Sequence, residues 1–270
     1  MRNKFLTYFI LVVGAVVFAY PFIWMVFATF KPEFEISNLY PLSKNMSFKN
    51  YSVVFGKIPI LRAFFNSLFV SLSITFSVII FGSIVGYALS RLNFYGRDFI
   101  LMLILFTMMI PFQITLIPTY VLIVKLGLVD TYAGLILPGM MSSFSILIFR
   151  QFFLTIPASL IESARLDGCN NFQIVFKIII PLSKPAVVTV GILTFMSSWN
   201  EVLWPLIVIR NEKLMTMPQL VTIFVLGGQA ESQLGVQLAC ATLLALPIVI
   251  AYLFFQRYFI ESMATTGLKE

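Results

Sequence analysis

The segment "ESARLDGCNNFQIVFKIIIPL", residues 162–182, decides the fold prediction because it is polar while the stretches on both sides of it are apolar. The whole chain has 270 residues, of which 60% are hydrophobic and 11% are charged. A water-soluble domain of this size cannot bury so much apolar surface, so we predict that a lipid bilayer surrounds much of the chain. The polar and helix-breaking residues of the segment are Glu162, Arg165, Asp167, Gly168, Lys177 and Pro181.

The pattern around this segment predicts a short amphipathic helix, a break and a second helix. Pro157 suits the first turn of a helix, and Ser159 and Glu162 have the spacing of a capping box. Gly168 is the kind of residue that stops a helix in the left-handed conformation. One face of the second helix is predicted to carry Phe172, Val175, Phe176 and Ile179, before Pro181 and Pro185 end or kink it.

Such a segment is longer than a connection between two membrane helices needs to be. Ala164 and Gly168 are small and four residues apart, so we expect them to share a face that another backbone can approach. The alternative is an interfacial helix lying on lipid. Glu162 and Asp167 would then face anionic headgroups, so a protein-docking surface is the preferred interpretation.

Six stretches are apolar enough to cross about 30 Å of hydrocarbon. The stretch at the N-terminus follows Arg2 and Lys4 and is too long for a cleaved signal peptide, so we expect it to be retained. Residues 214–226 are shorter and fit an interfacial or re-entrant piece. The fold class predicted is an all-α integral membrane protein whose transmembrane helices cover roughly residues 5–30, 66–90, 99–124, 132–149, 186–209 and 235–256.

Prolines within these stretches predict bent helices, which are either simple kinks or the walls of a pathway. Six spans place both termini on one side, and Arg2 and Lys4 favour the cytoplasm for that side. The prolines are Pro21, Pro111, Pro118, Pro138, Pro205 and Pro247.

Several function classes are excluded by residue types. The chain has no histidine, which removes histidine metal sites and Ser-His-Asp triads, and its two cysteines, Cys169 and Cys240, do not form a disulfide framework. The sequence has no phosphate-binding G-x-x-x-x-G-K-[ST] loop, so we do not expect it to hydrolyse ATP. The net charge of +7 is dispersed and predicts no nucleic-acid site.

Glu201 is the single acidic or basic residue within the predicted spans. It either lines a polar cavity or lies near the membrane surface. An acidic residue inside the membrane is a functional candidate by default, so Glu201 is kept as one. Trp199 and Trp204 are interpreted as interfacial anchors in preference to stacking platforms.

The polar segment resembles the EAA loop of bacterial ABC-importer permeases. That motif reads E-A-A, three residues, G, nine residues, I-x-L-P, and here it becomes Glu162-Ser163-Ala164, Gly168 and Ile178-Ile179-Ile180-Pro181. Ser163 and Ile180 are mild departures from the motif.

Other motifs are similar to the carbohydrate-importer branch of these permeases, the maltose-permease type. They are "NS" at 66–67, "GLVDTYAGLILP" at 127–138, "RQFF" at 150–153, "WNEVLWPL" at 199–206 and "QRYF" at 256–259.

The resemblance implies the type I ABC importer permease fold, with six transmembrane helices and a cytoplasmic coupling helix. Residues 1–270 would form a single permease domain and residues 157–185 its coupling loop. In this family the glutamate contacts a separate ATPase and the glycine permits the turn. The coupling residues carried over on the motif are Glu162, Ser163, Ala164, Arg165, Asp167 and Gly168.

The resemblance also implies partners. These are a second, homologous permease in a heterodimer, two cytoplasmic ATPase subunits that bind ATP and Mg, and an extracytoplasmic solute-binding protein. The chain itself would hold no cofactor and no metal, and would cross the bacterial cell membrane with both termini in the cytoplasm. The C-terminal segment "ATTGLKE", residues 264–270, would reach into the ATPase interface.

The expected solute is a di- or oligosaccharide, for which Asn200, Glu201 and Gln113 are candidate pathway residues. Three alternatives stay open. The first is another solute, such as glycerol phosphate or an amino acid. The second is an ion-coupled carrier that works alone through Glu201. The third is a membrane enzyme or scaffold, for which the sequence offers no catalytic constellation.

Overall fold

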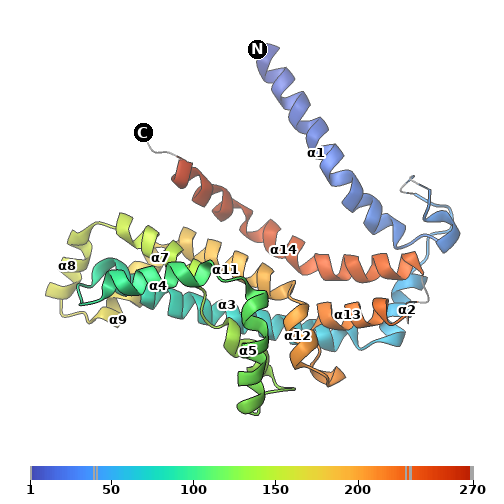
Figure 1. The fold of residues 1–270 in the computed structure, drawn as a ribbon. Helices are drawn as coiled ribbons and strands as arrows, with labels where there is room; N and C mark the ends of the chain where they lie inside the picture. The colour runs from blue at the N-terminus through green and yellow to red at the C-terminus, as the bar shows by residue number, and fades with distance from the viewer. Residues whose placement is uncertain (1, 39, 41, 229, 231–232, 268–270) are drawn as a thin grey trace. The chain divides into compact units, whose positions relative to one another are not determined.

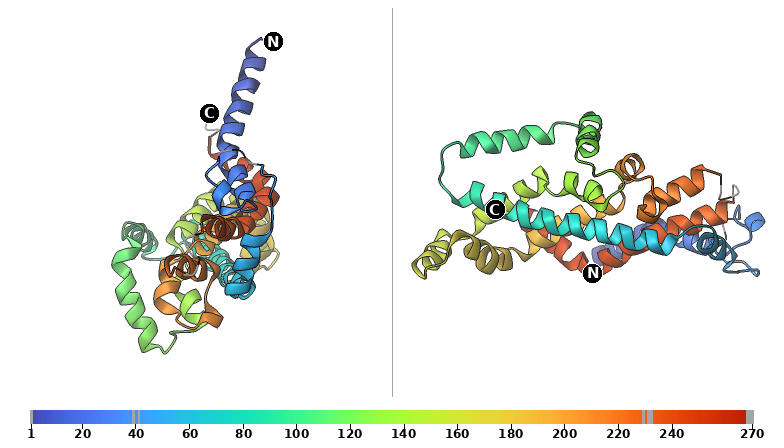
Figure 2. Two further views of the ribbon diagram at one scale, coloured as in Figure 1. Left: turned by 90° about the vertical axis from the view of Figure 1, so that its right-hand side faces the viewer. Right: turned by 90° about the horizontal axis from the view of Figure 1, so that it is seen from below.

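The computed structural model describes residues 2–38, 40, 42–228, 230 and 233–267, with side chains described for residues 4–254 and for 256 within these ranges. All regular structure in this part of the chain is helical (Figures 1 and 2). The α-helices are α1 (Arg2–Ala28), α2 (Lys49–Lys57), α3 (Ile60–Arg91), α4 (Arg97–Met108), α5 (Phe112–Lys125), α6 (Tyr132–Ile136), α7 (Ser143–Thr155), α8 (Ala158–Leu166), α9 (Asn171–Ile174), α10 (Ile180–Leu182), α11 (Lys184–Trp199), α12 (Leu203–Val208), α13 (Met217–Leu226) and α14 (Leu234–Gly267).

Three helices are long and apolar enough to cross a membrane, and the number rises to six if each of three bent pairs counts as one span. The three are Lys4–Ala28, Ile60–Arg91 and Leu234–Phe254. The bent pairs are Arg97–Met108 with Phe112–Lys125, Tyr132–Gly139 with Ser143–Thr155, and Asn171–Leu182 with Lys184–Trp199. The predicted class of fold is therefore confirmed, whereas three of the predicted spans are not single helices.

The predicted span 99–124 divides into α4 and α5, which meet at an angle of 101° (Figure 1). The amides of Met109 and Ile110 close the end of α4 with bonds to Phe106 and Thr107. Pro111 follows, has no N–H to continue the ladder and keeps Ile110 away from helical backbone angles. The break is consequently fixed at one proline.

The predicted span 186–209 is also divided, because α11 ends at Trp199 and a separate helix, α12, follows. The partner of α11 in a bent pair is instead Asn171–Leu182, at an angle of 87°. Pro181 and Pro185 flank the break at Ser183, as predicted, and each removes one backbone donor. Residues 214–226 contain the short apolar helix α13, and its interfacial or re-entrant placement stays a prediction.

The described chain divides into two compact units. Unit 1 comprises Met1–Ala63 and Leu220–Val249. Within it, the Glu33 carboxylate accepts from the amides of Leu234 and Gly235, at 2.6 and 3.1 Å, and so caps the start of α14. A Cβ on Gly235 would lie 2.5 Å from Nδ2 of Asn50, which explains the glycine there. Most apolar side chains of α1 are exposed, as expected for a helix that faces lipid, and the buried Ala28 lies at its end.

Unit 2 comprises Phe64–Gln219 and Ile250–Glu270 and contains the motifs quoted above. Within it, α3 and α7 approach closely, because a Cβ on Gly86 would lie 2.8 Å from Cβ of Phe149 and 3.0 Å from the amide nitrogen of Arg150. Gly82, one turn earlier, faces the Phe149 ring. Two glycines four residues apart allow two backbones to approach closely, a common device in membranes. α7 also packs against α4 and α11.

Candidate functional site

The first helix of the proposed coupling loop, α8, begins differently from the prediction. Pro157 occupies the N-cap position without a side-chain hydrogen bond, and helical residues start at Ala158. Because Ser159 lies inside the helix and not at its cap, the predicted capping box of Ser159 with Glu162 is wrong. Pro157 has a φ of −57° and a ψ of 134°, so the chain enters the helix directly after this residue without a polar cap.

The end of α8 agrees with the prediction. Gly168 has a φ of +83°, the left-handed conformation. The amide of Cys169 donates to the carbonyl of Ala164 and the amide of Gly168 to that of Arg165, both at 3.0 Å. This pair of bonds is a Schellman motif, which satisfies the carbonyls that the helix end leaves open.

A capping box is present one step later, at the start of α9. The Asn170 side chain accepts from the Gln173 amide, and the Gln173 side chain accepts from the Asn170 amide, both at 2.9 Å. Asn-x-x-Gln uses the same chemistry as Ser-x-x-Glu, so this signal was present in the sequence. The loop therefore contains a helix stop and a helix start separated by very few residues.

α8 has a buried face and an exposed face. Ile161 and Ala164 are buried in a core with Phe149, Phe153 and Ile174. Ala164 therefore packs inside this chain and does not share an open face with the exposed Gly168, while its part in coupling stays a prediction. The other motif residues are exposed: Glu162, Ser163, Arg165, Asp167 and Gly168.

The second half of the loop also differs from the predicted face. Val175 and Ile179 are buried, as expected, but Phe172 and Phe176 are exposed, and Ile174 is buried in their place. A π-helical stretch over Val175–Ile179 changes the angular spacing of the side chains, which a strict 3.6-residue period does not anticipate.

Two residues of α3 hold this loop, and neither was singled out from the sequence. The guanidinium of Arg91 donates to the carbonyls of Phe153 and Ile156, where α7 passes into α8. The buried hydroxyl of Tyr87 donates to Oδ1 of Asn171 at 3.3 Å. The last turn of α3 is therefore bonded to both halves of the loop.

A cavity of about 470 Å³ lies elsewhere in unit 2, between α3, α7 and α11. This volume is within the usual range of small-molecule sites. Glu201 lines the cavity, which is the first of the two positions predicted for it. Its Oε1 accepts a hydrogen bond from the Trp204 amide at 3.1 Å. The lining includes Ile74, Val78, Phe112, Ser142, Phe144, Ser145, Thr194, Ser197, Ser198, Glu201 and Trp204.

The other candidate pathway residues lie outside the cavity lining. Gln113 is exposed on α5, although its neighbour Phe112 lines the cavity. Asn200 is exposed and its Nδ2 donates to the carbonyl of Met196. Trp199 and Trp204 are 1% and 5% exposed, so the interpretation as surface anchors is wrong; Trp199 stacks on Phe195, and Trp204 lines the cavity.

The motifs at 66–67, 127–138 and 199–206 meet in one hydrogen-bonded cluster. Tyr132 donates to Oδ1 of Asn66 at 2.7 Å, and Nδ2 of Asn66 donates to the carbonyls of Lys213 and Met215. The indole N–H of Trp204 donates to the carbonyl of Gly134, where any Cβ would lie 2.3 Å from a backbone oxygen. These motif residues position the backbone beside the cavity.

The chain is helical, has up to six membrane spans, and has a polar loop and a cavity between its helices. These features are typical of a membrane transport component. Residues 78–265 match the family described as binding-protein-dependent transport system inner membrane component. The chain belongs to this family. It is the permease component of an ABC importer, a multi-pass inner membrane protein without catalytic activity, and membership implies ATPase and binding-protein partners. This finding replaces the alternatives of a lone ion-coupled carrier and of a membrane enzyme.

Relatives and a solved structure agree with this assignment. The chain is 36% identical over 260 residues to the arabinooligosaccharides transport system permease protein AraQ of Bacillus subtilis (strain 168), covering 94% of this chain and 92% of that protein. It is 30% identical to the sn-glycerol-3-phosphate transport system permease protein UgpE of Brucella abortus (strain 2308), covering 98% and 97%. A crystal structure of a bacterial ABC transporter involved in the import of the acidic polysaccharide alginate matches with a TM-score of 0.80 and 26% identity, covering 96% of both chains.

Proposed function

We propose that this permease imports a di- or oligosaccharide and that residues 157–185 are its cytoplasmic coupling loop. The observation that supports the coupling role is that α8 has two different faces. Ile161 and Ala164 are buried within this chain, whereas Glu162, Arg165 and Asp167 are exposed. None of these three charged side chains forms a hydrogen bond or ion pair with the other described residues. The opposite face of this helix is packed in the core of the same chain, so its exposed and unpaired polar face is held in place and suited to binding a partner.

The partner at this face is proposed to be one of two cytoplasmic ATPase subunits, which bind ATP and Mg. Glu162 would contact the ATPase, and Gly168 would set the angle between the two helices of the loop. A second, related permease would complete a heterodimer, and both termini would lie in the cytoplasm. The proposed contact of residues 264–270 with the ATPase falls largely outside the described residues.

The sugar assignment is supported by the chemistry of the cavity and by one relative. Hydroxyl and aromatic side chains line the cavity, which suits hydroxyl groups and the apolar faces of sugar rings. The relative AraQ is named for arabinooligosaccharides. Glycerol phosphate is the second candidate, because UgpE is named for it.

The test is co-purification of the tagged chain from native membranes in mild detergent, with uptake measured in the same strain. Glu162→Ala should keep the chain in the membrane but reduce both ATPase recovery and uptake several-fold. Glu212→Ala, which removes an exposed carboxylate outside the coupling loop, is the matched control. Full ATPase recovery and full uptake with Glu162→Ala would reject the proposed coupling contact.

A further inference from the structure

Four polar residues that line the cavity form one stripe on the α11 side. Thr194, Ser197, Ser198 and Glu201 follow the spacing i, i+3, i+4 and i+7, which places them on one face of a helix. Glu201 lies just beyond the end of the helix at Trp199 and continues the stripe. The rest of α11 is apolar apart from its N-terminal turn and Thr189, so the stripe is a local feature of the cavity wall.

The hydroxyls of this stripe are chemically available. Hydroxyl residues in membrane helices usually bond a carbonyl three or four residues earlier in their own helix. That pattern holds elsewhere in unit 2, for Thr75, Ser83, Thr107, Thr115 and Thr189. Thr194, Ser197 and Ser198 form no side-chain hydrogen bond within the described chain, although all three share the helix α11 with Thr189. Their hydrogen-bonding capacity is left for whatever fills the cavity.

The charge of the cavity wall has one sign. Glu201 is its one ionisable residue among the described side chains, and no Lys or Arg lines it. Oε1 of Glu201 is held by the Trp204 amide, which fixes the carboxylate and leaves Oε2 to accept from a ligand hydroxyl. A carboxylate fixed in the wall of a cavity between helices repels an anion more strongly than it would in bulk water, because the surrounding protein lowers the local dielectric constant.

We propose that the stripe Thr194, Ser197, Ser198 and Glu201 binds the hydroxyl groups of an uncharged solute, and that Glu201 excludes solutes bearing a phosphate or carboxylate. The inference rests on the proposed sugar import and decides between its two candidates. It places solute contacts on this subunit and makes Glu201 the residue that sets charge selectivity. The aromatic rings of Phe112, Phe144 and Trp204 supply the apolar part of the same wall.

The test measures equilibrium binding of two radiolabelled probes, arabinotriose and sn-glycerol 3-phosphate, to the purified complex of both permeases with the ATPase. The unaltered complex should bind arabinotriose and should bind glycerol phosphate at least about tenfold more weakly. Glu201→Gln keeps the acceptor for the Trp204 amide but removes the charge. It should tighten glycerol phosphate binding by roughly tenfold while changing arabinotriose binding only a few-fold.

A second variant removes the hydroxyls. The double change Ser197→Ala and Ser198→Ala should weaken arabinotriose binding by roughly tenfold or more, because two hydrogen bonds to the ligand are lost. Thr189→Ala is the matched control, since this hydroxyl of the same helix bonds the Pro185 carbonyl and does not line the cavity. It should leave the binding of both probes unchanged.

The inference is overturned if the unaltered complex binds glycerol phosphate as tightly as arabinotriose, or if neither the Glu201 nor the serine variants change binding. A second assay measures ATP-driven uptake of arabinotriose by proteoliposomes that hold the same complex and its binding protein. It distinguishes failure of the proposed binding stripe from failure of the proposed sugar import. Uptake that proceeds normally in all variants rejects only the binding stripe. Absence of uptake by the unaltered complex rejects the proposed sugar import itself.

Discussion

Arg91 donates from Nε to the carbonyl oxygen of Phe153 at 3.1 Å, although 62 residues separate them in the chain. The same guanidinium reaches the carbonyl of Ile156, so one side chain closes the C-terminal end of α7. Carbonyls at a helix end lack partners and carry partial negative charge, and a cation there satisfies both needs. α3 thereby fixes the point at which α8 begins.

Replacing Arg91 by Lys should destabilise the chain and impair uptake. Lys keeps the charge but loses the planar fork that serves two carbonyls at once. We expect a loss of about 1.5–3 kcal/mol in unfolding free energy, the range for hydrogen bonds to charged groups. The measurement is thermal unfolding in detergent together with uptake per mole of chain in the membrane.

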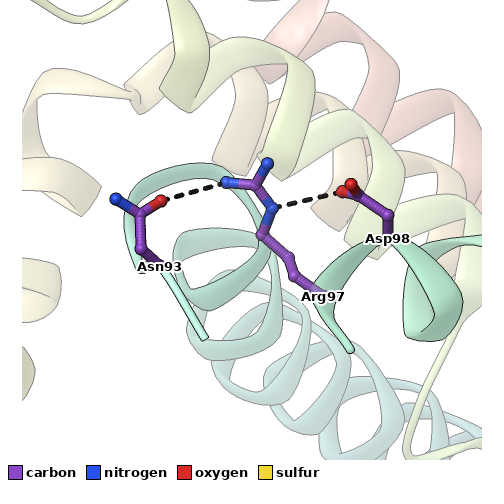
Figure 3. A network of polar contacts seen from close by, with 3 residues as sticks. All are labelled: Asn93, Arg97 and Asp98. Atoms are coloured by element: carbon purple, nitrogen blue, oxygen red, sulfur yellow. Dashed lines mark hydrogen bonds and ion pairs between the residues drawn. The ribbon is translucent and has the colours of Figure 1, made fainter. Parts of the chain in front are cut away.

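Arg97→Lys is the control for that change. Arg97 pairs with Asp98 at 3.3 Å and with Asn93 in an exposed network (Figure 3). An exposed pair of this kind contributes little, so stability should change by less than about 0.5 kcal/mol. Equal losses for Arg91→Lys and Arg97→Lys would contradict the role given to Arg91.

Gly86→Ala should separate α3 from α7. The new Cβ would lie 2.8 Å from Cβ of Phe149 and 3.0 Å from a backbone nitrogen, and backbone cannot move aside cheaply. Overpacking of this kind costs about 1–3 kcal/mol, seen as a lower midpoint of thermal unfolding. Gly191→Ala, whose Cβ would meet Ile79 at an ordinary 3.6 Å, should be neutral or stabilising by up to about 1 kcal/mol. The reverse order of the two midpoints would be incompatible with this packing.

Gly168→Ala should impair uptake through backbone strain alone. Nothing lies within 4 Å of a Cβ at this position, but its φ of +83° costs an alanine about 1–2 kcal/mol. Gly168→Asn should be milder, because asparagine tolerates the left-handed region better. Uptake should therefore rank Gly above Asn and Asn above Ala, at equal abundance in the membrane. Equal uptake by all three would show that the angle at residue 168 has no role.

Asp130 should make the loop before α6 sensitive to acid. Its Oδ1 accepts from the amides of Asn211 at 2.9 Å and of Arg210 at 2.6 Å. These bonds hold the pKa of the Asp130 carboxyl below its usual value of 3.8, with the Asn211 amide as the largest cause. A lowered folded-state pKa gives stability that is present above pH 3.8 and is lost as the pH falls through the folded value.

The corresponding measurement compares thermal unfolding of the chain and of Asp130→Asn from pH 6 down to pH 3. Asparagine keeps an acceptor and tolerates the φ of +55° found at this residue. The difference between the two proteins should be constant above about pH 5 and shrink below it. A difference that grows on acidification would have the wrong sign for this mechanism.

Local signals in the sequence predicted the fold class and the stop at Gly168, because both depend on residues close together in the chain. The capping box was predicted at Ser159 but lies at Asn170, since Pro157 can begin a helix without a polar cap. Apolar length predicted the spans, but their bends depend on where Pro111, Pro181 and Pro185 interrupt the backbone ladder.

The site was only partly predictable for a related reason. The stripe of Thr194, Ser197 and Ser198 has a helical period that could have been found in the sequence. The bond from Arg91 to Phe153 could not have been found that way, because it depends on how α3 and α7 cross. Gln113 is exposed on α5 while its neighbour Phe112 lines the cavity, so its place on a solute pathway stays a prediction.

The adjoining stop and start signals between Leu166 and Asn171 also determine which mutations this loop can tolerate. Both signals depend on the number of residues between their members, since the Schellman motif and the capping box form only at fixed separations. One inserted or deleted residue would rotate α9 by about 100° relative to its partners, and would bring Phe172 or Phe176 toward the space that Ile174 fills. Exposed positions of the loop should therefore accept many exchanges of side chain, while its length between Glu162 and Pro181 should accept no insertion or deletion.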